Sequence, residues 1–383
     1  MKHNPNQIEI PAAFYRGGTS KGVFFHERDL PPERAARDEI FLSVIGAPDP
    51  YKRQLNGMGG GISSLSKVVS IGPATRDDAD VDYTFAQVAI DRPAVDYATN
   101  CGNLSSAVGP FAIDEGLFRP DIADGTTTVR LHNTNTGVVI HAAIPVAGGM
   151  AAVAGDFEIQ GVFGTGARIQ LDYLKPGGAT TGNLLPAGEP TTLLDVPGEG
   201  TLEVSLVDAA TGMVFVAAEA LGLTATEHPE QIDADPEMMA RLDRIRRAAG
   251  VRMGLANRPE DVPLTNPRIG LLARATDFKA IDGRTIDANT QDITVRVVSM
   301  TNVHRVSPLT SALCLAAASR IEGTLAHSLA RGGNGDLRIG TPSGVLPVGA
   351  EVVRENGGWH ARYTRSYRTA RRLMQGSVLI PRI

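Results

Sequence analysis

The feature that most constrains the fold of this 383-residue chain is a faint internal repeat. Three pairs of segments follow one another in the same order along the chain: Lys21–Phe25 with Thr211–Phe215, Ser66–Val69 with Pro267–Gly270, and Cys101–Asn103 with Pro308–Thr310. The offset between partners changes slowly, from 190 to 201 to 207 residues. The common order and the slowly changing offset indicate a duplicated half of about 190 residues.

The repeat predicts two similar domains. Proline and glycine cluster between 188 and 197, where we place the boundary, so the first domain covers residues 1–188 and the second covers 189–372. We expect the C-terminal segment 373–383 to join the first domain.

Most periodic segments alternate apolar and polar residues, as half-buried strands do. Examples are Val81–Phe85, Leu202–Leu206 and Ile293–Val297. Thr211-Gly212 separates the second of these from Val214–Val216, which suggests a hairpin. The chain is therefore rich in short strands.

Three segments predict helices. Residues 104–115 and 311–321 are apolar almost all round, which is typical of buried helices. Residues 236–249 form an amphipathic helix with Asp235 as its N-cap and Gly250 as its terminator. Many strands with a few buried helices indicate the α+β class.

Composition excludes several classes of protein. The 37 Lys and Arg residues are outnumbered by 42 Asp and Glu, and the net charge of −5 argues against a general nucleic-acid binder. Cys101 and Cys314 are too few for a disulfide framework or an all-cysteine metal site, and the histidines lack metal-ligand spacing. The uncharged stretch 131–155 contains Pro145 and Gly148, so it predicts no membrane-spanning helix. We expect a soluble cytoplasmic protein without a metal.

The first candidate site is Asn100-Cys101-Gly102-Asn103, directly before a buried helix. Unpaired N–H groups and the positive end of the helix dipole favour a thiolate there, and the same groups can bind a carboxylate. A small buried residue beside a glycine turn explains the local sequence equally well.

The second candidate is Lys67, at the end of the glycine- and serine-rich loop 57–67. The loop matches neither nucleotide-binding fingerprint. Val68–Ile71 reads as a buried strand, so Lys67 would lie at its mouth, where partial burial favours the neutral amine that a base requires. A solvated loop lysine is the alternative, and the local sequence slightly favours it.

Two further segments are polar. Arg16–Gly22 is a glycine loop suited to presenting N–H and hydroxyl donors to an anion, although a plain turn is equally compatible. Five arginines lie between Arg362 and Arg372. With few aromatic residues among them, a solvated face, or one arginine that reaches a carboxylate, is favoured over a nucleic-acid patch.

Taken together, these motifs resemble the PrpF family, and the resemblance runs from about Ile8 to Pro381. It rests on five segments: Arg16–Gly22, Ile45–Tyr51, Ser64–Lys67, Asn100–Leu104 and Arg368–Gly376. The family is similar in fold to diaminopimelate epimerase. The resemblance therefore implies two pseudo-symmetric domains, each a curved sheet or open barrel wrapped round a central helix.

Epimerases of this fold use two cysteines, one from each half, as base and acid. Cys101 matches the first, but Pro308 stands at the position of the second. Cys314 lies six residues further on, inside the apolar helix, and we expect it in the core. A symmetric two-thiol racemase is therefore disfavoured.

The resemblance implies instead a cofactor-independent isomerase that moves a proton at an allylic carbon of an unsaturated di- or tricarboxylate. Lys67 and Cys101 would be the acid/base groups. The residues expected to bind substrate are Arg16, Gly18, Thr19, Ser20, Ser64, Ser66, Asn100, Gly102, Asn103, Arg268, Thr310 and Ser311. Arg268 is the repeat counterpart of Lys67; because it is always charged, it could hold a carboxylate but not act as a base.

Within the family, the resemblance favours a 2-methylaconitate cis–trans isomerase of propionate breakdown. A 4-oxalomesaconate tautomerase and a 3-methylitaconate isomerase are the alternatives, because none of these residues distinguishes a methyl from a carboxymethyl or an oxalo group on the substrate. An alternative of another class is a non-catalytic carboxylate-binding accessory protein of an aconitase-like enzyme. The expected partner is a small molecule, and the sequence leaves a homodimer open.

Overall fold

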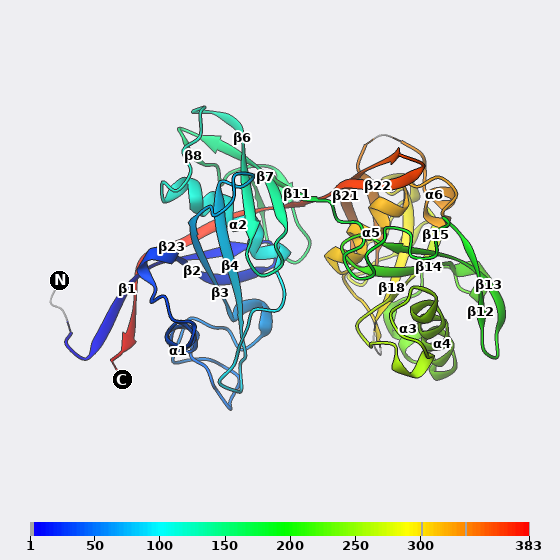
Figure 1. Ribbon diagram of the computed structural model, residues 1–383, viewed down its shortest axis with the longest axis horizontal. Coiled ribbons are helices and arrows are strands. Elements are labelled where there is room, and N and C mark those ends of the chain that lie inside the picture. Colours follow the sequence, from blue (N-terminus) through cyan, green and yellow to red (C-terminus); the bar gives the residue numbers. More distant parts are fainter. Residues whose placement is uncertain (1–3, 300–301, 334, 383) are drawn as a thin grey trace. The chain divides into compact units, whose positions relative to one another are not determined.

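The computed structural model describes residues 4–299, 302–333 and 335–382. The chain divides into two compact units: unit 1 contains Met1–Asp172 and Tyr367–Ile383, and unit 2 contains Tyr173–Ser366 (Figure 1). Each unit combines a many-stranded sheet with a few helices, which confirms the predicted α+β class.

The division falls earlier than the proline- and glycine-rich segment at 188–197. That segment lies within unit 2 and leads through β12 (Thr192–Val196) into the antiparallel strand β13 (Gly200–Asp208). Its turn-forming residues shape a hairpin. At the other end of the chain, β23 (Ala370–Pro381) pairs with β1 (Gln7–Gly17), so the C-terminal strand is hydrogen-bonded into unit 1.

Unit 1 contains a sheet in the order β23-β1-β2-β3-β4-β6-β7-β8. Besides β23 and β1, the strands of unit 1 are β2 (Ser20–His26), β3 (Lys67–Pro73), β4 (Val81–Val88), β5 (Val95–Asp96), β6 (Gly125–Asn133), β7 (Val139–Ala147), β8 (Met150–Ala151), and the separately paired β9 (Phe157–Glu158) and β10 (Thr165–Gly166). Strand β11 (Ile169–Leu174) crosses the division, and so do the last two residues of β22 (Gly358–Arg368). The pairs β2–β3 and β4–β6 are parallel, and the others in this order are antiparallel.

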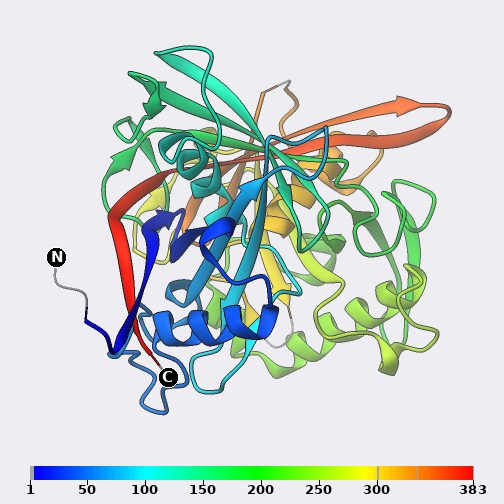
Figure 2. The same cartoon turned by 60° about the vertical axis from the view of Figure 1, so that its left-hand side comes forward.

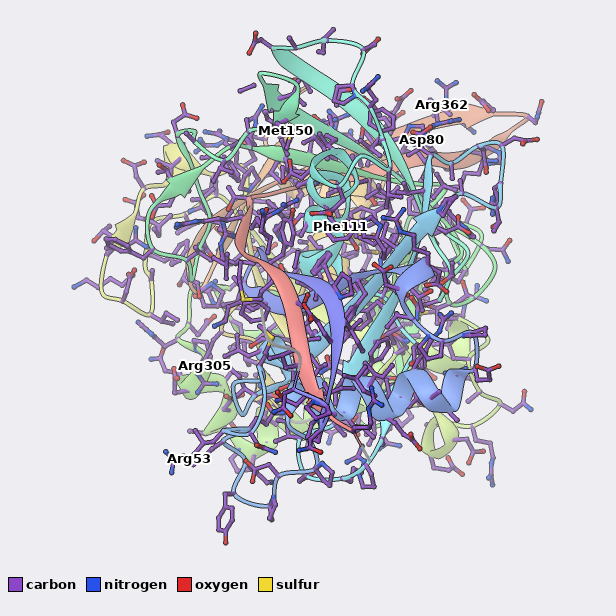
Figure 3. The ribbon with its side chains drawn as sticks, turned by 90° about the vertical axis from the view of Figure 1, so that its left-hand side faces the viewer. Arg53, Asp80, Phe111, Met150, Arg305 and Arg362 are labelled. Carbon is purple, nitrogen blue, oxygen red and sulfur yellow. The ribbon has the colours of Figure 1, made fainter. Side chains whose placement is uncertain are left out.

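Helix α2 (Gly102–Asp114) fills the inside of this sheet. Every residue from Leu104 to Ile113 is buried, and the helix contacts β1, β2, β3, β6, β7, β8 and β23. Figure 3 labels Phe111, which packs against Tyr15 and Phe24. An all-round apolar helix needs such an enclosure, and the prediction for residues 104–115 is confirmed within two residues at each end.

Helix α1 (Arg34–Ile45) covers the other face of the sheet, and Figure 2 shows it beside the strands of unit 1. Its buried residues Phe41, Val44 and Ile45 join a core cluster with Val68 of β3. Strand alternation thus gives β3 and β4 two covered faces, one towards α2 and one towards α1.

Unit 2 repeats the strand pattern of unit 1 in the order β12-β13-β14-β15-β18-β20-β21-β22, with β14–β15 and β18–β20 as its parallel pairs. The remaining strands are β14 (Gly212–Ala217), β15 (Arg268–Arg274), β16 (Phe278–Lys279), β17 (Thr285–Ile286), β18 (Ile293–Ser299), β19 (Asn302–Val303), β20 (Leu337–Thr341), β21 (Gly344–Glu355) and β22 (Gly358–Arg368). The helices are α3 (Pro229–Asp233), α4 (Pro236–Arg252), α5 (Leu309–Ala318) and α6 (Leu325–Leu329). The predicted hairpin of β13 and β14 is confirmed.

A charged pair is duplicated along with the strands. In unit 1, Arg130 donates from its backbone N and its guanidinium to the carboxylate of Asp80, whose backbone N donates to Arg130 O. In unit 2, Arg338 and Asp292 make the same set of bonds. The duplication predicted from three weak sequence matches therefore extends to side-chain chemistry.

Two helices of unit 2 depart from their predicted ends. Helix α5 begins at Leu309 and ends at Ala318, with Pro308 as its N-cap where α2 has Cys101. Helix α4 has the predicted N-cap Asp235 but runs through Gly250, so the predicted terminator is wrong. A Cβ on Gly250 would lie 2.4 Å from Val262 Cγ1, so this glycine serves close packing inside the helix.

Within the described residues, no helix is both long and apolar enough to cross a membrane.

The β1–β2 hairpin rests on the first turn of α2 because Gly17 has no side chain. A Cβ there would lie 2.6 Å from Asn103 O and 3.1 Å from Leu104 Cα. We expect Gly17→Ala to destabilise the fold by about 1–3 kcal/mol, since backbone atoms must move apart. Urea denaturation measures the effect. Gly332→Ala is the control, because a Cβ there meets nothing within 4 Å, and equal stability of the two variants would contradict the account.

The duplicated pair predicts acid sensitivity. Burial opposes ionisation of Asp292, but hydrogen bonds from Arg338 outweigh it and hold the pKa of Asp292 below 3.8, its ordinary value. A carboxyl of this kind stabilises the fold above its unfolded pKa and loses that contribution as the pH falls through its folded pKa. Asp292→Asn should therefore cost about 2 kcal/mol at pH 7.

In urea titrations, the difference in unfolding free energy between Asp292→Asn and the natural protein should shrink as the pH falls below 3.8 and through the lowered pKa of Asp292. Asp80→Asn, which breaks the corresponding pair in unit 1, should behave likewise, because the pKa of Asp80 is lowered by the same contacts against the same opposing burial. A difference in unfolding free energy that is independent of pH would contradict this explanation.

Candidate functional site

Lys67 is the first residue of β3, and its side chain is buried, with 8% of the residue exposed. Its Nζ donates to Gln87 Oε1 at 2.7 Å and lies 4.8 Å from the centre of the Phe85 ring. Gln87 and Phe85 belong to β4, and Lys67 and Gln87 are paired across the two strands. The lysine is therefore held inside unit 1 and is not a solvated loop residue.

The loop before Lys67 is folded by its own polar groups. Ser66 is fully buried, and its hydroxyl lies 2.7 Å from Gln54 Oε1 and 2.8 Å from Ile62 O. Gln54 Oε1 also accepts from the backbone N of Gly61. The Ser66 hydroxyl thus supports the loop, whereas Ser64 in the same loop is half-buried.

Cys101 is the N-cap of α2 and is partly exposed. Its thiol accepts no capping hydrogen bond, so the first N–H groups of the helix, from Gly102 onward, are not capped by it. Asn100 Oδ1 accepts from Cys101 N and from the hydroxyls of Tyr83 and Ser105. These bonds fix the backbone that carries the Cys101 thiol.

The tip of the β1–β2 hairpin meets the same helix end. Asn103 Nδ2 donates to Thr19 Oγ1 at 3.0 Å, and Arg368 Nε donates to Asn103 Oδ1 at 3.0 Å. Gly18 has φ +51°, and a Cβ there would lie 2.3 Å from Asn103 Oδ1. Thr19 is exposed, and its oxygen accepts from Asn103, so its own O–H is left to donate to a ligand.

β2 brings the lysine strand and the helix start together. A Cβ on Gly22 would lie 2.8 Å from Lys67 O and 2.9 Å from Leu104 Cδ1, so β3 and the first turn of α2 approach each other across this glycine. The predicted residues Lys67, Cys101, Thr19 and Asn103 thus come from elements that pack on one another in unit 1.

Two other predicted residues are engaged in support of the fold. Arg16 Nη1 donates to Gly18 O and to Thr369 O, which ties the hairpin to the chain beside β23. Burial, and then the charge of Arg371, lower the pKa of Arg16. Ser20 is 2% exposed at the start of β2.

In unit 2, the repeat counterparts form a cluster of their own. Arg268 is the first residue of β15, as Lys67 is of β3, and its Nη1 donates to Thr310 Oγ1 at 3.0 Å and Ser311 Oγ at 3.2 Å. Burial lowers the pKa of Arg268; burial, and then the charge of Arg268, lower the pKa of His304. Thr310 and Ser311 lie in the first turn of α5, so this cluster offers a cation and two hydroxyls to an anion.

Cys314 lies in the core of unit 2, as predicted. It is fully buried within α5, its Sγ donates to Val207 O at 3.4 Å, and burial raises the pKa of the thiol. A buried neutral thiol of this kind is inert.

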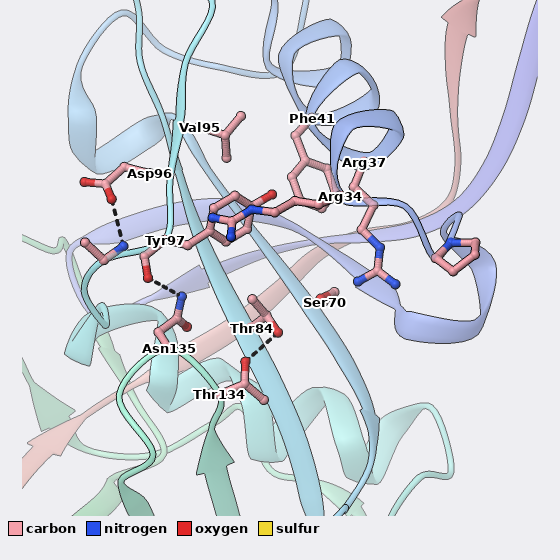
Figure 4. Close-up of a pocket in the computed structure, with 12 residues that line it drawn as sticks. Arg34, Arg37, Phe41, Ser70, Thr84, Val95, Asp96, Tyr97, Thr134 and Asn135 are labelled. Carbon is pink, nitrogen blue, oxygen red and sulfur yellow. Dashed lines mark hydrogen bonds between the residues drawn. The ribbon is translucent and has the colours of Figure 1, made fainter.

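A cavity of about 620 Å³ in unit 1 lies apart from these groups (Figure 4). Ser70 and Thr84, which line it, occupy the α1-facing side of β3 and β4, opposite to Lys67 and Gln87. Arg34 stacks on Tyr97 at its edge, with 4.0 Å between the guanidinium carbon and the ring centre. Neither Lys67 nor Cys101 lines this cavity.

Sequence reasoning did not single out Gln87, Gln54 or Arg368 as site residues. Gln87 follows Tyr83 and Phe85 in the strand alternation, so a polar residue at an inward position was a signal, but its partner depends on strand register. Arg368 was one of five clustered arginines, and the sequence did not distinguish it from the others. Among the described residues, no group of three or more His, Cys, Asp and Glu is arranged to hold a metal.

Comparison with known proteins gives a consistent result. The chain is 39% identical to a 2-methyl-aconitate isomerase of Shewanella oneidensis and 40% identical to one of Cupriavidus necator, over 99% and 100% of this chain and 98% and 99% of theirs. It is 38% identical to a 3-methylitaconate isomerase of Eubacterium barkeri over 98% of both chains.

Solved structures agree. A methylitaconate-delta-isomerase matches with a TM-score of 0.92 and 38% identity, over 98% of this chain and 96% of that one. A probable proline racemase from Agrobacterium radiobacter, at 15% identity and a TM-score of 0.50 over 96% and 92% of the chains, shares the fold alone, which supports the epimerase-like architecture. The model of the PrpF protein family matches residues 7–381. Because that match covers nearly the whole chain, and relatives of about 40% identity align along their full length, the chain belongs to the PrpF family.

Proposed function

We propose that this chain is a cofactor-independent isomerase of an unsaturated di- or tricarboxylate, with 2-methylaconitate as the first candidate substrate. The observation that carries the proposal is the buried Lys67 amine, which is hydrogen-bonded to a neutral amide beside the helix end that bears Cys101. Two of the most similar relatives are named for 2-methylaconitate.

Lys67, as the neutral amine, removes a proton from a carbon next to the C=C bond. The C–H bond breaks, an N–H bond forms, and the electron pair spreads over the C=C and the carboxylate as a dienolate. The N–H groups of the first turn of α2, from Gly102 onward, which the Cys101 side chain does not cap, stabilise the developing negative charge. No oxidant or reductant is consumed.

A proton then returns to the allylic system. The Cys101 thiol gives its own proton to the distal carbon, which moves the double bond and leaves a thiolate; transfer of the proton held on Lys67 to that thiolate resets both groups. If instead the dienolate rotates about its weakened C–C bond and Lys67 returns the proton to the carbon it came from, the result is cis–trans isomerisation. Lys67 thus serves either outcome, and Cys101 serves the shift of the double bond.

The substrate carboxylates require donors. In unit 1, Thr19 and Ser64 supply hydroxyls. Within unit 2, Arg268, Thr310 and Ser311 form a cluster of their own, a cation with two hydroxyls, which suits a carboxylate. Arg16, Ser20 and Ser66 act indirectly in this proposal, because they are buried or bonded to the backbone that shapes the loops.

A 3-methylitaconate isomerase is the second candidate, since a methylitaconate-delta-isomerase matches with a TM-score of 0.92. Proton NMR in D2O with 2-methylaconitate, 3-methylitaconate, 4-oxalomesaconate and cis-aconitate identifies the substrate by the acid that exchanges and isomerises. A protein that binds these acids but exchanges none of them would be an accessory protein, and the enzyme proposal would be wrong.

Lys67→Ala should abolish solvent deuterium exchange into the substrate, a loss of at least a thousandfold, because the group that removes the proton is gone. The control is Lys279→Ala, which removes an exposed lysine from β16 and should leave the exchange rate unchanged. Exchange by Lys67→Ala at the natural rate would show that another residue is the base.

Arg268→Gln should raise KM about tenfold or more, the equivalent of roughly 1.4 kcal/mol, because a charge-assisted bond to a substrate carboxylate is lost. Arg274→Gln, at the exposed end of the same strand, is the matched control. Initial-rate kinetics measure both variants, and an unchanged KM for Arg268→Gln would exclude Arg268 as a carboxylate ligand.

A further inference from the structure

The amide of Gln87 has only one orientation that satisfies its neighbours. Its Nε2 donates to Ser66 O at 2.9 Å and Ser63 O at 3.0 Å, both of which can only accept. A flipped amide would place its oxygen against those two carbonyl oxygens and its NH2 against the Lys67 amine. Oε1 is therefore directed at Lys67 Nζ, 2.7 Å away.

Two contacts then fix the position of the Lys67 amine, and the pairing of two strands sets both. Lys67 and Gln87 are direct partners across the antiparallel pair β3–β4. Phe85, two residues before Gln87 and on the same strand face, places its ring centre 4.8 Å from Nζ. The amine is thus held by a ring on one side and an amide oxygen on another, although a lysine side chain is otherwise highly flexible.

The partner of the amine is neutral. Within the part of the chain that the structure describes, no Asp or Glu carboxylate forms an ion pair with Lys67. The titratable groups on neighbouring elements are Tyr83 and Asp82 on β4, Cys101 and Asp114 at the two ends of α2, Asp96 on β5, and Lys21 and His26 on β2. Of these, Asp96 accepts from Ala98 N and Lys21 lies over the Phe14 ring.

This arrangement suits a base. A neutral amine has two N–H bonds and one lone pair; when Gln87 accepts from one N–H, the lone pair is turned away from Gln87 and remains available to a substrate proton. The same oxygen also accepts from the ammonium that forms on proton abstraction. A carboxylate at this position would instead stabilise the ammonium before the reaction and so suppress the base.

We propose that Gln87 is a positioning residue for the reaction: its amide, anchored to the carbonyls of residues 63 and 66, aims the Lys67 amine and keeps it available as the neutral base. The proposal rests on the proposed function, in which Lys67 removes the proton. It accounts for the loop 57–66 as well, because that loop supplies the two carbonyls that orient the amide.

The test is the pH profile of kcat/KM for deuterium exchange into the substrate. Gln87→Glu retains an acceptor but adds a negative charge, so the acid limb should move up by at least one pH unit, with a tenfold or larger loss on that limb and recovery at higher pH. Gln87→Leu removes the acceptor, so the rate should fall at least tenfold at every pH, without an upward displacement of the limb.

Gln7→Glu is the matched control, because it makes the same change of charge at the half-buried first residue of β1 and should reproduce the natural profile. Thermal melting checks that each variant is folded; if Gln87→Leu is not, the profile of Gln87→Glu alone decides. A Gln87→Glu profile that superimposes on the natural one would overturn the proposal. A natural protein that exchanged none of the acids would refute the proposed function, and exchange by Lys67→Ala at the natural rate would refute Lys67 as the base. An inactive Lys67→Ala with a natural Gln87→Glu profile would refute only the role of Gln87.

Discussion

The enclosure of one apolar helix determines how unit 1 is built. Helix α2 is buried over ten successive residues, from Leu104 to Ile113, so strands must surround it on several sides. The helix end cannot be enclosed in the same way, because its first N–H groups need polar partners. The hairpin tip, the lysine strand and Cys101 all gather at that end, and the chemistry we propose follows from the place where the apolar enclosure stops.

The duplication explains which residues were free to diverge. The strand order, the parallel pairs and the Asp–Arg pairs are the same in both units, since they hold the sheets together. The residues at the starts of β3 and β15 and at the starts of α2 and α5 differ: Lys67 and Cys101 in unit 1, Arg268 and Pro308 in unit 2. One unit carries groups that exchange protons, and the other carries a permanent cation.

Much of this was predictable from local sequence. Apolar residues all round a segment predict a buried helix, and Asp235 before Pro236 predicts a helix start, because both signals depend on the residues themselves. Helix α1 was missed because its first half is polar and its buried residues lie near its end. The prediction that Gly250 ends its helix is wrong because close packing against Val262 overrides the tendency of glycine to end a helix. The contact of Gln87 with Lys67 could not be predicted, because it depends on the register of two strands.

The central claim is that the amine of Lys67 removes a proton from the substrate. The most direct measurement is a crystal structure of the natural protein with an unreactive unsaturated tricarboxylate bound. The Gln87→Leu and Lys67→Ala proteins with the same ligand serve as comparisons. In the natural protein, we expect Nζ of Lys67 within about 3.5 Å of the carbon that corresponds to the exchanging position, the distance of a near-attack geometry. A ligand bound only in the cavity beside Arg34 and Tyr97, on the opposite face of β3, would contradict the account.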